Sequence, residues 1–147
     1  PDAQLVMTHR DPVDVVASAC SLVNAVRPMF SDEVDPEVIG QCLLETFDVM
    51  IERTLAYKAK HGWDSIYDMH YADVMRDPIG EISKIYTHFD EPFTAEAEAA
   101  MGLYMEVNPK GKHGQHTYSL EDYGLSKVQV RKRYGDYCER FRIPVKS

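Results

Sequence analysis

Arg10 and Ser18 stand eight residues apart around the predicted start of a helix, and together they form a candidate anion site. The short apolar run 5–8 before Arg10 is typical of a strand, and Asp11-Pro12 favours a helix start because aspartate caps helices and proline tolerates the first turn. In α/β sheets, ligands collect beyond the carboxyl ends of the strands, where the next helix begins. A guanidinium and a hydroxyl at that place can bind one tetrahedral anion, so the segment predicts a phosphate-type site.

Asp14, which lies between Arg10 and Ser18, admits two interpretations of this segment. It can reach back to the start of the helix as in a capping box, which leaves Arg10 for a ligand. Alternatively, Arg10 pairs with Asp14 one turn away at the surface, and Ser18 has no special role. The segment alone leaves both interpretations open. In either case we expect one buried apolar face on this helix, made of Val13, Val16, Ala17 and Cys20.

A second candidate anion-binding element is the polar loop 108–119, which is rich in glycine and in cationic or titratable side chains. It contains Lys110, Gly111 and Lys112; glycine lets a backbone approach an anion closely, and lysine adds positive charge. Loops of this length inside a compact domain often bind ligands. His113 and His116 have a spacing that metal ligands use, but no carboxylate or cysteine partner stands beside them, so we expect no metal site.

Helix caps and hydrophobic spacing predict the elements that must position these residues. Aspartate precedes proline at 11–12, 35–36 and 77–78, and Thr94 and Ser126 are further expected caps. We expect a buried stripe on the long helix and a solvated basic face on the last one. The stripe is Ile39, Leu43, Phe47, Met50 and Thr54, and the basic face is Lys127, Arg131, Lys132 and Arg133. The predicted strands are 4–8 and 64–69, and the predicted helices are 12–26, 36–60, 78–89, 94–106 and 126–141.

Only two segments are predicted as strands, and because they are joined through helices we expect them to be parallel. Parallel sheets are normally buried on both faces and contain more than two strands. We therefore expect residues 1–147 to be the C-terminal part of a single, larger α/β domain whose first strands lie upstream. The absence of an initiator methionine fits this expectation. The alternative is a small, mostly helical domain in which the segment around Ile66 is not a strand.

Composition limits the class of protein. The chain has 147 residues, of which 44% are hydrophobic and 27% charged, as in an ordinary soluble domain. A formal charge of −8 argues against general binding to nucleic acids or anionic membranes. No apolar run is long enough for a membrane span and no signal peptide opens the chain, so we expect a cytoplasmic protein. The three cysteines, Cys20, Cys42 and Cys138, lack a C-x-x-C spacing and predict neither disulfides nor a zinc site.

Three segments, 10–18, 66–78 and 109–114, occur in the order found in the sulfotransferases that use 3′-phosphoadenosine 5′-phosphosulfate (PAPS), and the chain resembles that family. The family carries an Arg and a Ser eight residues apart, a Tyr-Glu-Asp-Met-like strand end, and a basic-Lys-Gly-x-x-Gly loop. Tyr71, Asp73, Met75 and Pro78 fit the second element, from which Ala72 departs. In the third element, Pro109 stands where the family usually has arginine.

The resemblance implies a P-loop NTPase-like, three-layer α/β fold, present here as a helix-rich C-terminal part with about two parallel strands. It implies that Arg10 and Ser18 hold the 3′-phosphate of PAPS or of its product PAP, and that Tyr71 contacts the adenine. Lys110 and the backbone around Gly111 would close over the same phosphate. Lys112 or His113 is expected to compensate for the missing arginine.

The reaction implied by the resemblance is transfer of a sulfuryl group from PAPS to a hydroxyl or amine of a small-molecule acceptor. The family's 5′-phosphosulfate loop and general base lie upstream of these segments, so we assign no catalytic residue and expect the chain alone to be inactive. His9, beside Arg10, lies on the cofactor side and is not expected to be the base. Two alternatives stay open: a nucleotide kinase-like P-loop phosphotransferase, and a non-enzymatic protein-interaction module. Neither the acceptor nor the oligomeric state follows from the sequence.

Overall fold

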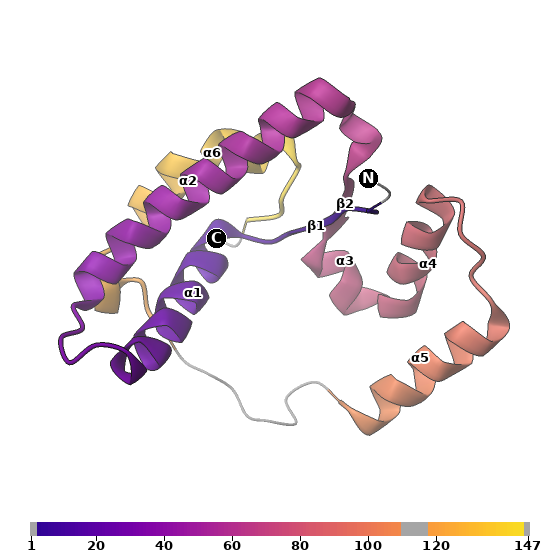
Figure 1. Ribbon diagram of the computed structural model, residues 1–147, viewed down its shortest axis with the longest axis horizontal. Helices are drawn as coiled ribbons and strands as arrows, with labels where there is room; N and C mark the ends of the chain where they lie inside the picture. Colours follow the sequence, from indigo (N-terminus) through magenta and orange to yellow (C-terminus); the bar gives the residue numbers. More distant parts are fainter. Residues whose placement is uncertain (1–2, 110–117, 146–147) are drawn as a thin grey trace. The chain divides into compact units, whose positions relative to one another are not determined.

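The computed structural model describes residues 3–109 and 118–145. The chain divides into two compact units, which we describe separately. The strand unit comprises the described parts of 1–9 and 64–116, and the helical unit comprises those of 10–63 and 117–147. Figure 1 labels the elements of both.

The strand unit contains two parallel strands, β1 (Val6–His9) and β2 (Tyr67–His70), paired in register from Val6 with Tyr67 to His9 with His70. Within the described residues these two strands form the whole sheet. The prediction of two parallel strands is confirmed, with bounds shifted by up to three residues toward the C-terminus. The alternative without a second strand is wrong, because β2 makes a backbone ladder with β1.

Three helices complete the strand unit: α3 (Tyr71–Arg76), α4 (Pro78–His88) and α5 (Ala95–Val107). The sequence predicted α4 and α5 within one residue but missed α3. This helix ends at Asp77, whose φ of −144° and ψ of 79° are extended, because the residue before a proline is pushed out of the helical region. The Asp77 carboxylate then caps α4 by accepting the amide of Gly80 at 3.0 Å.

The helical unit contains α1 (Pro12–Val26), α2 (Pro36–His61) and α6 (Lys127–Arg140), with short 3-10 turns η1 (Arg27–Met29) and η3 (Glu121–Tyr123). A further turn, η2 (Trp63–Ser65), connects α2 to β2. The helix bounds agree with the predicted ones to within one residue. The expected caps are present: Asp35 accepts from the amide of Glu37, and Ser126 from that of Gln129.

The core of the helical unit lies where α1, α2, η3 and α6 meet. Its buried side chains include Val16, Ala17, Cys20, Ile39, Leu44, Tyr123, Val130 and Tyr134. The predicted buried face of α1 is confirmed, since Val16, Ala17 and Cys20 are buried and Val13 packs against them.

The predicted stripe on α2 is only partly correct. Ile39 is buried and Leu43 and Phe47 pack on the core, but Met50 is 55% exposed. At about 100° per residue Met50 falls on the same side of α2 as Ile39 and Leu43, so its exposure does not follow from the helical spacing.

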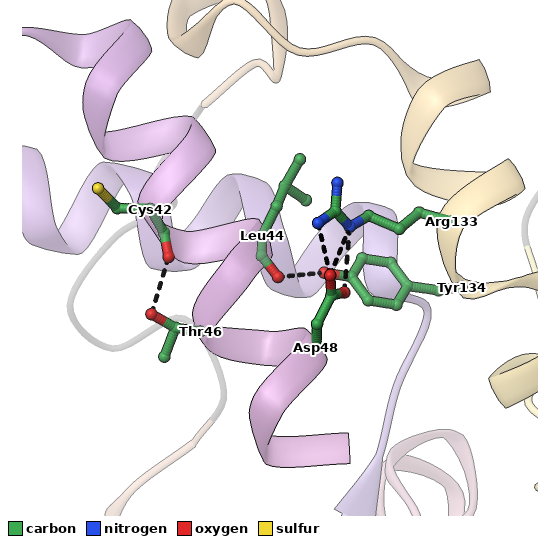
Figure 2. A network of polar contacts seen from close by, with 6 residues as sticks. All are labelled: Cys42, Leu44, Thr46, Asp48, Arg133 and Tyr134. Carbon is green, nitrogen blue, oxygen red and sulfur yellow. Dashed lines mark hydrogen bonds and ion pairs between the residues drawn. The ribbon is translucent and has the colours of Figure 1, made fainter. Parts of the chain in front are cut away.

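The basic face of α6 is largely solvated, as predicted, since Lys127, Lys132 and Arg133 are exposed, but two of its residues also form ion pairs that the sequence did not predict. Arg131 pairs with Asp11, and Arg133 pairs with Asp48. Figure 2 shows the second pair: the Nε of Arg133 donates to both carboxylate oxygens of Asp48 at 3.0 Å, and the hydroxyl of Tyr134 donates to the carbonyl of Leu44 at 3.0 Å. Among the described residues, no helix has the length and apolar character that crossing a membrane requires.

Candidate functional site

The start of α1 depends on Asp11, the N-cap residue. The Oδ1 of Asp11 accepts the amide of Val13 at 3.0 Å, and Pro12, in the first turn, has no amide hydrogen. Two of the groups that usually hold an anion at a helix N-terminus are therefore occupied or absent. An anion bound here must be held mainly by side chains, and the candidate side chains are those of Arg10 and Ser18.

Arg10 and Asp14 form an ion pair one helical turn apart, with Nη2 and Oδ2 separated by 3.2 Å. The pairing of Arg10 with Asp14 that the sequence allows is therefore present in the structure, and Asp11 is the N-cap residue of α1. The pair does not exclude a ligand. The Arg10 side chain is 32% exposed, a guanidinium has five donor hydrogens, and half-exposed pairs are weak.

Ser18 lies one further turn along α1, half-buried on the side of the helix that carries Asp14. Residues four apart on a helix are neighbours. Arg10, Asp14 and Ser18 consequently form one line along the surface of α1, which we call the α1 ladder. The structure pairs Arg10 with Asp14, and Ser18 follows Asp14 at the same four-residue spacing.

Arg131 of α6 is a site residue that sequence reasoning missed. Its Nη2 donates to Oδ2 of Asp11 at 3.1 Å, and the Asp11 side chain is only 4% exposed. The two residues are 120 positions apart, so no local pattern signals the pair. A buried carboxylate with a charged partner therefore adjoins Arg10 in the chain.

A surface cavity of about 540 Å³ runs beside the α1 ladder within the helical unit. Arg10 and Ser18 do not line it, but Asp14 and Ala17 do, and Lys127 and Arg131 of α6 form part of another wall. The complete lining is Asp11, Val13, Asp14, Ala17, Tyr118, Ser119, Leu120, Glu121, Lys127 and Arg131. The ladder thus borders a hollow large enough for part of a nucleotide.

In the strand unit, two histidines lie at the carboxyl ends of the paired strands. The Nε2 of His9, which is buried, and Oδ1 of Asp68 lie 3.0 Å apart. The rings of His9 and His70 have centroids 5.7 Å apart. The Nδ1 of His70 is buried and has no hydrogen-bond partner among the described residues. His9 is thus buried and paired with Asp68 in the strand unit.

Tyr71, the predicted adenine contact, is the first residue of α3 and is half-buried. It follows His70 directly at the end of β2. Burial, with a contribution from the Glu81 carboxylate, raises the pKa of the nearby strand residue Tyr67.

Two thiols of the helical unit, those of Cys20 and Cys138, have raised pKa values. Burial raises the pKa of Cys20. Burial, and then the negative charge of Asp11, raises the pKa of Cys138. Thiolate chemistry needs a lowered pKa, so neither cysteine is suited to it.

Lys110, Gly111 and Lys112 lie outside the described residues, as do His113 and His116. Within the described parts of the chain, no group of three or more metal-ligating side chains comes together.

Comparison with known proteins places the chain in a family. A family model described as "Sulfotransferase family" matches residues 1–95, a range that includes Arg10, Ser18 and Tyr71 but not the loop 110–112. No curated protein matches significantly.

Two solved structures are similar. The sulfotransferase STF9 from Mycobacterium avium is 28% identical with a TM-score of 0.87, and the match covers 100% of this chain and 38% of that one. The sulfotransferase STF1 from Mycobacterium tuberculosis H37Rv is 34% identical with a TM-score of 0.76, over 92% of this chain and 34% of that one. The chain thus spans little more than a third of these proteins, and the predicted helix-rich, partial sulfotransferase fold is confirmed. The chain belongs to the sulfotransferase family.

Proposed function

We propose that this chain supplies the 3′-phosphate and adenine side of the cofactor site in a PAPS-dependent sulfotransferase. The observation that carries the proposal is the α1 ladder, which sets Arg10 and Ser18 on one side of a helix that follows a parallel strand directly. We also propose that residues 1–147 are the C-terminal part of one domain, with the 5′-phosphosulfate loop and the general base supplied by residues upstream.

Sulfuryl transfer resembles phosphoryl transfer, in which the protein mainly positions the reactants and neutralises charge. In this proposal, Arg10 donates to the 3′-phosphate through its guanidinium and Ser18 donates through its hydroxyl. Lys110 and Lys112 add positive charge, Gly111 allows close backbone approach, and Tyr71 contacts the adenine ring. The acceptor is a small molecule with a hydroxyl or amine.

Arg10 can bind a phosphate only if its ion pair with Asp14 does not outcompete the phosphate. Because the pair is about one-third exposed at Arg10, its contribution is expected to be about 1 kcal/mol or less. A charge-assisted bond to a phosphate is stronger than that. Arg10 can therefore keep Asp14 as a support for its side chain and still bind a phosphate through its remaining donors.

The test compares two ligands that differ only in the 3′-phosphate, PAP and AMP, titrated into the complete protein. The ratio of their dissociation constants, Kd(AMP)/Kd(PAP), measures recognition of that group, and we call it the discrimination ratio. Arg10→Ala is expected to lower the ratio by about tenfold or more, and Ser18→Ala by several-fold, with AMP binding unchanged. Arg27→Ala, at the far end of α1, is the matched control and should leave the ratio unchanged.

Two outcomes would refute the proposal: a wild-type discrimination ratio near one, or a ratio that survives Arg10→Ala. ATP that binds more tightly than PAP would favour the kinase-like alternative, because ATP lacks a 3′-phosphate. A protein partner captured equally well with and without PAP, in a protein that binds no nucleotide, would favour the interaction module.

A further inference from the structure

We propose that Arg131 is a positioning residue of the 3′-phosphate site, which holds and neutralises Asp11 without touching the cofactor; the inference rests on the proposed function. Asp11 directly follows Arg10, the proposed phosphate ligand, and caps α1. The Nη2 of Arg131 donates to Oδ2 of Asp11 at 3.1 Å. A residue of the last helix thereby fixes the position next to the phosphate ligand.

Burial explains why Asp11 needs this partner. Its side chain is only 4% exposed, and a buried carboxylate is costly unless both oxygens have donors. The amide of Val13 donates to Oδ1, and Arg131 donates to Oδ2. Removal of Arg131 takes away the charged donor and leaves a buried negative charge at the start of α1.

The positive charge of Arg131 affects phosphate binding because it helps to balance the carboxylates near Arg10. Two carboxylates, Asp11 and Asp14, adjoin the start of α1, and two guanidinium groups, Arg10 and Arg131, pair with them. Replacing Arg131 with a neutral residue makes the charge beside Arg10 more negative by one unit. A phosphate monoester is itself close to a dianion near neutral pH, so the uncompensated carboxylate would oppose its binding and compete for Arg10.

This role predicts opposite effects from the two residues of one ion pair. Arg131→Gln removes a positive charge and should weaken phosphate binding. Asp11→Asn removes a negative charge and keeps the cap, because asparagine caps helices as well as aspartate. If the pair merely held α6 against α1, either substitution would break it and both would weaken binding alike.

Arg133 provides a matched control two positions further along α6. It also pairs with an aspartate of another helix in the same unit, since its Nε lies 3.0 Å from both oxygens of Asp48. Asp48 is 85 positions away in sequence and belongs to α2, not to the start of α1. Arg133→Gln therefore removes a comparable Arg–Asp pair without changing the charge beside Arg10.

The experiment measures the discrimination ratio, Kd(AMP)/Kd(PAP), on the complete protein. Arg131→Gln should lower the ratio about tenfold, a size typical of a misplaced or poorly balanced ligand-holding group. Arg131→Lys, which keeps the charge, should retain most of the ratio. Asp11→Asn and Arg133→Gln should not lower it, and Asp11→Asn combined with Arg131→Gln should restore most of the loss.

Equal losses in Arg131→Gln and Asp11→Asn would overturn the inference, because they would indicate a structural pair. A wild-type ratio in Arg131→Gln would overturn it as well. If Arg10→Ala lowers the ratio while Arg131→Gln does not, only the further inference fails. If the wild-type protein shows no discrimination, the proposed function fails with it.

Discussion

Gly40, in α2, packs so closely against the backbone of η3 that a single added methyl group should destabilise the helical unit. A Cβ at this position would lie 2.4 Å from the carbonyl oxygen of Tyr123 and 3.3 Å from Cδ1 of Leu125. The first contact is with a backbone atom, which cannot rotate away. Alanine would gain about 1 kcal/mol in helix propensity, but overpacking costs about 1–3 kcal/mol. Because the clash is with a backbone atom, we take the upper part of that cost, about 2–3 kcal/mol, and expect a net destabilisation of about 1–2 kcal/mol for Gly40→Ala.

Gly135, in α6, is the matched control. A Cβ built on Gly135 meets no atom within 4 Å, so the propensity gain acts alone. Gly135→Ala should therefore stabilise the same unit by up to about 1 kcal/mol. The same substitution in two helices of one unit should thus act with opposite sign.

The assay is urea unfolding followed by the fluorescence of Trp63, the single tryptophan of the chain. The ring of Trp63 lies 6.4 Å from that of Phe141, so its emission reports on the helical unit. With an m-value of about 1–3 kcal/mol/M, the midpoint should fall by roughly 0.5–1 M in Gly40→Ala and rise in Gly135→Ala. A Gly40→Ala midpoint equal to or above that of the wild type would refute the reasoning, because α2 and η3 would then have room for the methyl group.

Two further predictions concern the contacts between α2 and α6 in Figure 2. Tyr134→Phe should destabilise the chain by only about 1 kcal/mol in the same unfolding assay. The loss is small because the Leu44 carbonyl, which accepts from Tyr134, keeps its intrahelical partner. A loss of about 3 kcal/mol or more would contradict this. The Arg133 guanidinium lowers the pKa of Asp48 below 3.8, so the stabilisation by ionised Asp48 is present above about pH 4 and is lost as the pH falls through that lowered pKa. The midpoint difference between wild type and Asp48→Asn should therefore be seen at neutral pH and vanish in strong acid, and a difference independent of pH would argue against the ion pair.

Helix starts were predictable because capping is local. Asp11, Asp35 and Asp77 each accept an amide two or three residues ahead, and each precedes a proline. The cap, the proline and the accepted amide all fall within four positions of sequence. Helix α3 lacks such a signal, since His70 caps it without a side-chain hydrogen bond, and the sequence did not predict it.

Charged partners far apart in sequence were not predictable. The spacing of Arg131 and Arg133 on α6 is typical of an exposed basic face, but their aspartates lie on α1 and α2. The exposure of Met50 on α2 was missed as well, because the spacing of apolar residues does not show how far along the helix its neighbours η3 and α1 pack. These contacts form only when the helices pack.

The sequence by itself determined the family resemblance, the helix starts, the two strands and the anion-site hypothesis for Arg10 and Ser18, because each is signalled by short segments whose residues lie close together in the chain. Only the tertiary structure decided which charges accompany that site. It paired Asp14 with Arg10, buried Asp11, and brought Arg131 to Asp11 from 120 positions away. The physical reason is that a buried carboxylate takes its counterion from whichever helix packs beside it, and packing is a property of the whole fold.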